Sequence, residues 1–125
     1  MIQVDLRSRV PIYEQLYENV RKMILEGTLV EDEKIPSVRE LASLLTINPN
    51  TIQKAYKALE KDGYIYSVSG RGNFVNVLKP ALMDQEQEVV YKTLIRTIEE
   101  AKLVGIPKER IMEGLIAIYK EENND

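Results

Sequence analysis

Hydrophobic residues recur at helical spacing in the first stretch of the chain with a clear pattern, residues 11–26. Pro11 suits a first helical position, because the amide hydrogen that proline lacks would have no helical acceptor there. Gly27 suits the residue after a helix, where glycine takes a positive φ without strain. The pattern predicts one amphipathic helix over 11–26. Its apolar positions are Ile12, Leu16, Val20, Met23 and Ile24.

A second, shorter helix is predicted after an irregular connection over residues 27–36. Ser37 and Glu40 have the spacing of a capping box, in which the serine oxygen accepts a hydrogen bond from the Glu40 amide. The helix is expected to end near Thr46. Its buried stripe is expected to consist of Val38, Leu41, Ala42 and Leu45.

A third helix is expected to begin only a few residues later. Asn48 can cap its first turn, Pro49 fits that turn, and Gly63 follows its end. Two short helices joined by a turn of about four residues are typical of a helix-turn-helix. The apolar positions of the third helix are Ile52, Ala55, Tyr56 and Leu59.

Two short β-prone runs, 64–68 and 73–77, come next. The segment Ser69-Gly70-Arg71-Gly72 lies between them, and its glycines can take the positive φ that a tight hairpin needs. Helix, helix-turn-helix and hairpin in this order predict a winged helix-turn-helix over residues 1–79.

The rest of the chain, 80–125, has the pattern of two further helices. The first is expected over about 84–104, before Gly105, and Pro107 opens the second, whose end at 121–125 is expected to fray. Two helices alone cannot cover both of their apolar faces well, so one stripe is predicted to be a dimer seam and not an intramolecular core. The stripe consists of Val90, Leu94, Ile98, Ala101, Ile111, Leu115 and Ile118.

The predicted fold class is therefore mainly α. A winged helix-turn-helix of three helices and a two-stranded hairpin is followed by a short two-helix dimerisation tail.

Composition excludes several kinds of chemistry. The 125 residues include no cysteine and no histidine, which removes disulfides, thiolate nucleophiles, cysteine-based zinc sites and the commonest general base. The acidic pairs Glu99-Glu100 and Glu121-Glu122 are predicted to be solvated surface, not metal ligands. We expect no enzyme, no cofactor and no metal. No apolar run approaches the length of a membrane helix and the start lacks a signal-peptide pattern, so a soluble, cytoplasmic protein is expected.

The net charge of −3 is unevenly distributed. Residues 1–79 hold eleven Lys/Arg and ten Asp/Glu, whereas 80–125 hold six and ten. The segment 37–57 has three basic residues and one acidic residue. Because the acidity lies mostly in the tail, the predicted helix-turn-helix remains suited to contact with phosphates.

Several short motifs follow one another between Leu29 and Val75. They are Lys34-Ile35-Pro36-Ser37-Val38-Arg39-Glu40-Leu41-Ala42, Asn48-Pro49-Asn50-Thr51, Ala55-Tyr56-x-x-Leu59-Glu60-x-x-Gly63-Tyr64-Ile65 and Gly70-x-Gly72-x-Phe74-Val75. In this order they resemble the GntR family of bacterial repressors, and Pro11-Ile12-Tyr13-Glu14-Gln15 is similar too. The resemblance implies a double-stranded DNA operator as partner. One departure is Glu31-Asp32, where the family typically has a Pro-Gly pair.

The C-terminal region, 80–125, indicates which subfamily the chain resembles. About 46 residues remain after the winged domain, too few for the larger ligand-binding domains of most GntR subfamilies, and their length and helical character resemble the YtrA subfamily. That resemblance implies a homodimer joined through its C-terminal helices, often in control of a transporter operon. Whether a small-molecule effector binds between the protomers stays open.

The predicted DNA contacts lie on the second and third helices. Arg39 is expected to bridge a phosphate or read a guanine edge; the alternative is a solvated arginine paired with a nearby acid. Such third helices enter the major groove N-terminus first. For Ser37 and Asn48 the alternative is a role as a helix cap alone. For Lys54 and Lys57 the alternative is an ordinary solvated helix face. The contacts expected from the third helix are Asn48, Asn50, Thr51, Gln53, Lys54 and Lys57.

The predicted wing tip, Gly70-Arg71-Gly72, is expected near a minor groove, because an arginine between glycines can approach it closely. A plain hairpin turn would use the glycines but would not require Arg71. The tyrosines are expected to pack in or below the core and not to stack on bases, with Tyr66 as an open case. The residues in question are Tyr13, Tyr17, Tyr56, Tyr64 and Tyr66.

The sequence thus predicts a homodimeric repressor of its own or a transporter operon, which binds an inverted repeat. The alternative from another class is a winged-helix module that contacts protein instead of nucleic acid. That alternative explains the acidic total, but not the polar, basic face of the third helix or Arg71 at the wing.

Overall fold

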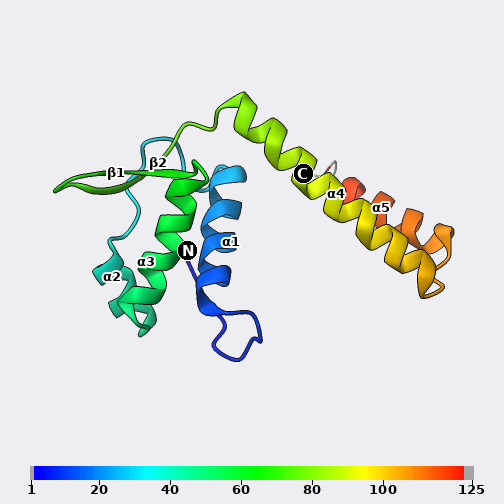
Figure 1. Cartoon of the computed structure of the whole chain (residues 1–125), viewed down its shortest axis with the longest axis horizontal. Helices are drawn as coiled ribbons and strands as arrows, with labels where there is room; N and C mark the ends of the chain where they lie inside the picture. The colour runs from blue at the N-terminus through cyan, green and yellow to red at the C-terminus, as the bar shows by residue number, and fades with distance from the viewer. Residues whose placement is uncertain (1, 123–125) are drawn as a thin grey trace. The chain divides into compact units, whose positions relative to one another are not determined.

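Three helices and one β-hairpin form the first of two compact units of the chain, Met1–Lys79, here called the head; Pro80–Asp125 is called the tail. The computed structural model describes residues 2–122. Figure 1 shows α3 with α1 on one side and α2 on the other. The predicted winged helix-turn-helix is confirmed. Its elements are α1 (Ile12–Leu25), α2 (Val38–Leu45), α3 (Pro49–Lys61), β1 (Ile65–Val68) and β2 (Gly72–Val75).

Both predicted caps of the helix-turn-helix are present. The Ser37 hydroxyl oxygen accepts a hydrogen bond from the Glu40 amide at 3.1 Å, which starts α2. The Asn48 Oδ1 accepts one from the Asn50 amide at 2.8 Å, which starts α3 with Pro49 in its first turn. These bonds satisfy amides that have no acceptor inside the helix, so the local sequence determines where both helices begin.

The core of the head lies among the inner faces of the three helices and the hairpin. Tyr56 of α3 and Tyr64 before β1 are buried, which confirms the packing role predicted for these two rings. A fully buried aliphatic side chain contributes roughly 1.5–3 kcal/mol to stability, so this cluster holds the helices together. Its largest fully buried aliphatic members are Leu16, Val20, Ile35, Leu41, Ile52, Leu59, Ile65 and Val75.

The connection between α1 and α2 is less irregular than the sequence suggested. Lys34 forms an isolated antiparallel bridge with Phe74 of β2. The segment therefore lies along β2 like a third, very short strand. The local sequence gave no indication of this, because the partner lies about forty residues further on. The backbone bonds are Asp32 N–H to Val75 O (2.8 Å), Val75 N–H to Glu33 O (2.9 Å) and Ile35 N–H to Asn73 O (3.0 Å).

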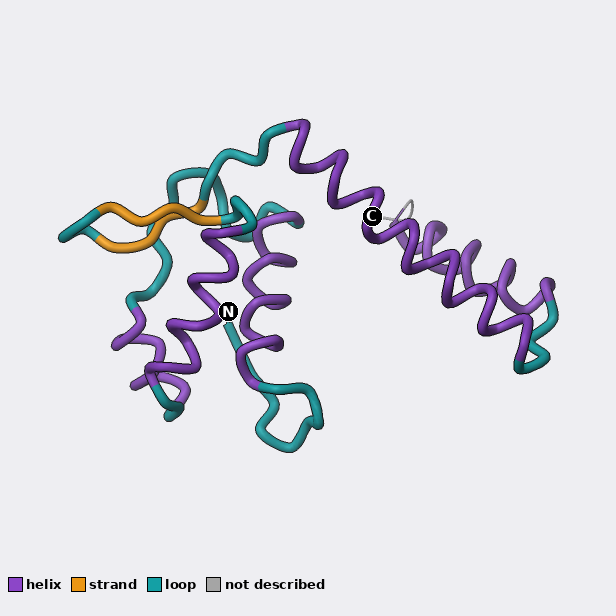
Figure 2. The backbone as a smooth tube through the Cα atoms, in the orientation of Figure 1, coloured by secondary structure: helices purple, strands orange, loops and turns teal. Residues whose placement is uncertain are grey.

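The hairpin is an antiparallel pair in which Ile65 faces Val75 and Val68 faces Gly72. Figure 2 shows its two strands, in orange, extending beyond the helices to a free tip. Gly70 (φ 77°) and Gly72 (φ 120°) take the positive φ values that the predicted turn requires. The Tyr66 and Phe74 rings stack across the two strands with centroids 5.5 Å apart, so Tyr66 packs within the wing.

The tail consists of α4 (Pro80–Leu103) and α5 (Lys108–Glu122). Helix α4 begins at Pro80, about four residues earlier than predicted, since proline is accepted in a first helical turn. Gly105 takes a φ of 89° between the helices, as expected after a helix end. Helix α5 continues through Glu122; the expectation of fraying for 123–125 lies outside the described residues. No helix over residues 2–122 is long and apolar enough to cross a membrane.

Candidate nucleic-acid interface

The outer face of α3 carries a polar stripe. Its first and last members each lie three and four residues from the two middle ones, so all share one side of the helix, opposite the side that enters the core. All are exposed, whereas Thr51, next to the stripe, is half-buried. This face offers amide groups and ammonium groups but no carboxylate within its run. The stripe consists of Asn50, Gln53, Lys54 and Lys57.

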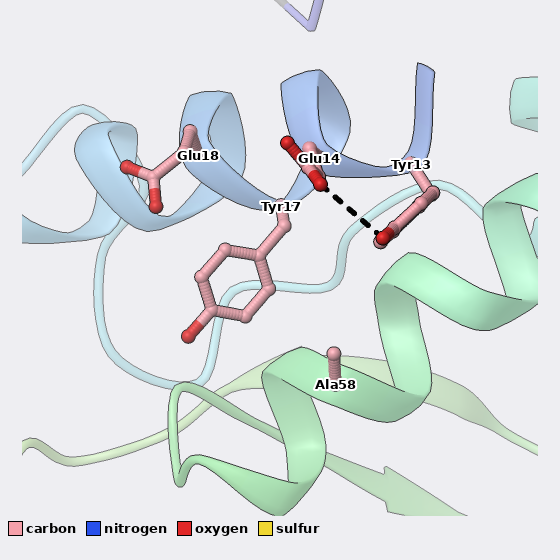
Figure 3. A pocket seen from close by; sticks show the side chains of 5 residues that line it. All are labelled: Tyr13, Glu14, Tyr17, Glu18 and Ala58. Atoms are coloured by element: carbon pink, nitrogen blue, oxygen red, sulfur yellow. Dashed lines mark hydrogen bonds between the residues drawn. The ribbon is translucent and has the colours of Figure 1, made fainter. Parts of the chain in front are cut away.

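Lys54 is held at the α1 side of this stripe. Its Nζ lies 3.7 Å from the centroid of the Tyr13 ring, within cation–π range. The Tyr13 hydroxyl donates a hydrogen bond to Glu14 Oε1 at 3.2 Å (Figure 3). The aromatic face thus positions one of the predicted DNA-contacting lysines and leaves the ammonium group exposed.

The start of α2 is fixed against α3. The buried Tyr56 hydroxyl donates a hydrogen bond to the Pro36 carbonyl oxygen at 2.7 Å, one residue before the Ser37 cap. Burial raises the pKa of the Tyr56 hydroxyl well above its ordinary value, with a smaller contribution from the Glu40 charge, so the donor stays protonated. Arg39, in the first turn of α2, is exposed. Its guanidinium is therefore carried by a helix start that α3 holds in place.

The wing tip presents Arg71 to solvent. Its amide donates to the Val68 carbonyl at 2.9 Å and closes the turn, with Gly70 and Gly72 on either side. A Cβ placed on Gly72 would lie 3.1 Å from Lys34 Cε, so the stem of Lys34 passes directly over this glycine. Lys34 is thus a second cation beside the wing that the sequence analysis did not assign. It opens the first motif of the family resemblance, which is where it could have been found.

The predicted contact residues form three groups and not one cluster. Ser37 and Arg39 lie at the start of α2, the polar stripe lies along α3, and Gly70-Arg71-Gly72 forms the wing tip. Asn48 and Ser37 both act as caps, so their side-chain oxygens already have a partner. Within residues 2–122 no group of three or more acidic side chains could hold a metal ion.

A shallow pocket of about 280 Å³ lies beside this interface, between α1 and α3. Figure 3 shows its lining, with Glu14 and Glu18 on α1 and Ala58 on α3. Tyr17, also in the lining, donates its hydroxyl hydrogen bond to Asp62. Because the lining carries carboxylates and no cation, the pocket does not extend the surface suited to phosphates.

The family profile described as bacterial regulatory proteins, gntR family, matches residues 12–75, from the first residue of α1 to the last of β2. The chain belongs to the GntR family. This GntR protein is a helix-turn-helix, DNA-binding transcription regulator and not an enzyme, which decides against a winged-helix module that contacts only protein.

Individual relatives and solved structures support the assignment to the GntR family. The GntR chain is 39% identical over 116 residues to the HTH-type transcriptional repressor YtrA of Bacillus subtilis (strain 168), covering 92% of this chain and 89% of YtrA. The likeness to YtrA is therefore confirmed. A transcriptional antiterminator from Listeria monocytogenes EGD-e is similar with a TM-score of 0.79 and 33% identity, over 96% of this chain and 90% of that one. The AraR DNA-binding domain in complex with operator ORE1 is similar with a TM-score of 0.51 and 33% identity, over 60% and 92%.

Proposed function

We propose that this GntR regulator is a homodimeric repressor that binds an inverted-repeat operator, with α3 in the major groove and the wing near the minor groove. The observation that carries the proposal is the exposed polar stripe of α3, which begins at the helix end that such motifs insert into the groove. The similarity to a DNA-binding domain in complex with its operator supports the binding of operator DNA by this head.

The three groups of side chains suit different parts of a duplex. Asn50 and Gln53 can pair bidentately with adenine, and the half-buried Thr51 can meet a thymine methyl group. Arg39 suits a guanine edge or a phosphate, and the helix starts capped by Ser37 and Asn48 favour phosphates. The remaining expected contacts are Lys54 and Lys57 with the backbone, and the wing residues Gly70, Arg71 and Gly72, with Lys34 beside them, at the minor groove.

The tail supplies the proposed dimer seam. On the predicted stripe, Val90, Leu94, Leu115 and Ile118 are 54%, 50%, 47% and 68% exposed, while Ile98, Ala101 and Ile111 are half-buried. Large apolar side chains exposed on one stripe of both helices are typical of a surface that another protein covers. A second copy of the same tail fits, because it brings an equivalent apolar face and gives the two-fold symmetry of an inverted repeat.

The proposed biological role is repression of transcription. The relative YtrA is described as a repressor, which favours repression of the regulator's own or a transporter operon here. A regulator that acts on a bacterial chromosome works in the cytoplasm. A small-molecule effector, if it acts, has to bind the two dimer states with different affinity in order to change the separation of the heads.

Selection of bound sequences from random duplex DNA tests the proposal with the full-length protein. The expected result is an inverted repeat whose half-site centres are about 34 Å apart, or one helical turn. Arg39→Ala is expected to weaken binding to the selected operator at least tenfold, since a guanidinium contact with a base is worth about 1–3 kcal/mol and the dimer loses one in each half-site. Arg110→Ala, an exposed arginine of α5, is the matched control. An Arg39→Ala protein that binds as tightly as the control contradicts the assignment of α2.

A further inference from the structure

The loop that leads into α1, residues 5–10, is held at both ends by one side chain. Gln15 Oε1 accepts a hydrogen bond from the Asp5 amide at 2.7 Å. Gln15 Nε2 donates to the Asp5 carbonyl at 3.0 Å and to the Val10 carbonyl at 2.8 Å. The Gln15 side chain, on α1, thereby joins the two ends of residues 5–10, here called the arginine loop.

The inside of the arginine loop is also bonded. The Asp5 carboxylate accepts from the Arg7 amide at 2.9 Å, and the Ser8 hydroxyl oxygen accepts from the Val10 amide at 3.1 Å. The segment before it is anchored on the head, since Ile2 is buried and Asn19 of α1 donates to the Gln3 carbonyl. The Asp5 carboxylate is thus engaged within the loop.

The arginine loop presents two cations to solvent. Arg7 and Arg9 are both exposed, and neither guanidinium has an ion pair or a side-chain hydrogen bond with any of residues 2–122. The hydrogen bonds of the loop fix the backbone that carries both side chains. Arginine is the side chain best suited to bidentate contact with a phosphate, so an anion outside the chain fits these groups.

The arginine loop lies at the groove-reading end of α3. Helices α1 and α3 run in the same direction, because Tyr13 meets Lys54 and, further along, Arg21 Nε donates to the Tyr64 hydroxyl just after α3. Tyr13 lies in the first turn of α1 and meets Lys54 in the second turn of α3, so the residues before α1 lie toward the first turn of α3. Figure 1 shows the loop at the end of the head where α2 turns into α3.

We propose that the arginine loop is a phosphate-binding element that grips the DNA backbone beside the major groove entered by α3. The loop precedes the family profile, which begins at residue 12, and it adds a contact to the three groups described above. The inference rests on the proposed DNA-binding mode. The duplex backbone is the occupant favoured by the position of the loop, at the same end of the head as the start of α3, and by the charge of its two arginines.

The test compares two double variants of the full-length protein. Arg7→Ala/Arg9→Ala removes both loop cations, and Lys22→Ala/Lys61→Ala removes two exposed cations from the opposite ends of α1 and α3. Affinity is measured over a salt series for the selected operator and for an unrelated duplex of equal length. Phosphate contacts carry no sequence information, so the loop variant is expected to lose about tenfold or more on both duplexes.

The salt dependence identifies the cause. Each lost phosphate contact lowers the slope of log K against log salt by about 0.9, so the loop variant should lose up to that amount per arginine and per head. The control variant is expected to keep the wild-type slope. Arg7→Lys/Arg9→Lys should recover most of the slope, and Gln15→Ala should weaken binding while leaving both arginines in place. Equal urea midpoints of the loop variant and the wild type establish that folding is unchanged.

The outcomes distinguish failure of the loop inference from failure of the proposed DNA-binding function. If the wild type binds duplex DNA and both double variants share its affinity and slope, the arginine loop has no role and the proposed function stands. If the wild type shows no salt-dependent binding to any duplex, the proposed function fails and the loop inference fails with it. Ethylation interference gives a second readout. Ethylation of the phosphates beside the major groove entered by α3 should weaken binding of the wild type and of the control variant, but not of the loop variant.

Discussion

The Tyr66 hydroxyl of β1 donates a hydrogen bond to Asp32 Oδ1 at 2.7 Å, and Asp32 itself has a φ of 65°. The GntR resemblance places a glycine at this position, where a positive φ is easily reached. Aspartate tolerates the left-handed region better than most residues, so the fold accepts the exchange. The carboxylate, by accepting this hydrogen bond, raises the pKa of the Tyr66 hydroxyl above its ordinary value. The departure from the family pattern thus attaches the α1–α2 connection to the wing.

Substitutions of Asp32 should separate backbone strain from the side-chain bond. Asp32→Ala keeps a Cβ at positive φ and loses the bond to Tyr66, so it should be less stable than Asp32→Gly by about 1 kcal/mol. Asp32→Gly should stay close to the wild type, since relief of the backbone offsets the lost bond. Urea unfolding at fixed protein concentration measures both. Equal stability of the two variants would show that the positive φ is not a significant cost.

A second prediction concerns pH. Tyr56 has its hydroxyl pKa raised far above the ordinary 10.0, mainly by burial. A folded-state pKa above the unfolded value gives stability that is complete below pH 10 and is lost as the pH rises further. From Tyr56 alone the free energy of unfolding should fall by about 1.4 kcal/mol per pH unit there.

Tyr56→Phe tests this by removing the titrating group. The variant should be less stable at pH 7 by about 0.5–1.5 kcal/mol, because the bond to the Pro36 carbonyl is lost, yet its stability should fall less steeply above pH 10. Tyr91→Phe, at an exposed tail position, is the control and should follow the wild type. A wild-type slope in Tyr56→Phe would mean that another group causes the alkaline loss.

The elements that the sequence predicted are those determined by neighbours along the chain. The caps at Ser37 and Asn48 join residues two or three positions apart, and the polar stripe of α3 follows from the helical period alone. The residues expected to contact DNA could be chosen on this basis, because exposure on a helix is set by the pattern of its buried side.

The contacts that the sequence did not predict join distant segments. The attachment of residues 32–35 to β2 and the position of Lys54 over Tyr13 each span about forty residues. The closure of the arginine loop by Gln15 spans ten residues but uses a side chain inside a helix, which no local rule marks. Such contacts depend on how the elements pack, and periodicity contains no information about that packing.

The tail makes a third prediction possible. Leu94→Glu places a charge on the proposed seam, where burial of an unpaired carboxylate is strongly unfavourable, so the variant should be monomeric by sedimentation. Its affinity for the selected operator should fall by two orders of magnitude or more, since each head then binds alone. Leu103→Glu, at the 81% exposed end of α4, is the control and should remain dimeric. A dimeric Leu94→Glu protein with normal affinity would place the seam elsewhere.

The two wing glycines should respond differently to substitution. Gly70 (φ 77°) lies in open space, so Gly70→Ala should cost only the strain of a left-handed residue, about 1 kcal/mol. Gly72 (φ 120°) has a backbone conformation that is largely restricted to glycine, so Gly72→Ala should cost about 1–3 kcal/mol.

The nearby lysine provides the decisive comparison for Gly72. Its new Cβ would also displace Lys34, whose flexible stem can move aside at small cost. Adding Lys34→Ala should therefore recover little of the stability lost in Gly72→Ala, as measured by urea unfolding. Full recovery in the double variant would identify the contact with Lys34, and not the backbone, as the reason that glycine is needed at this point of the wing.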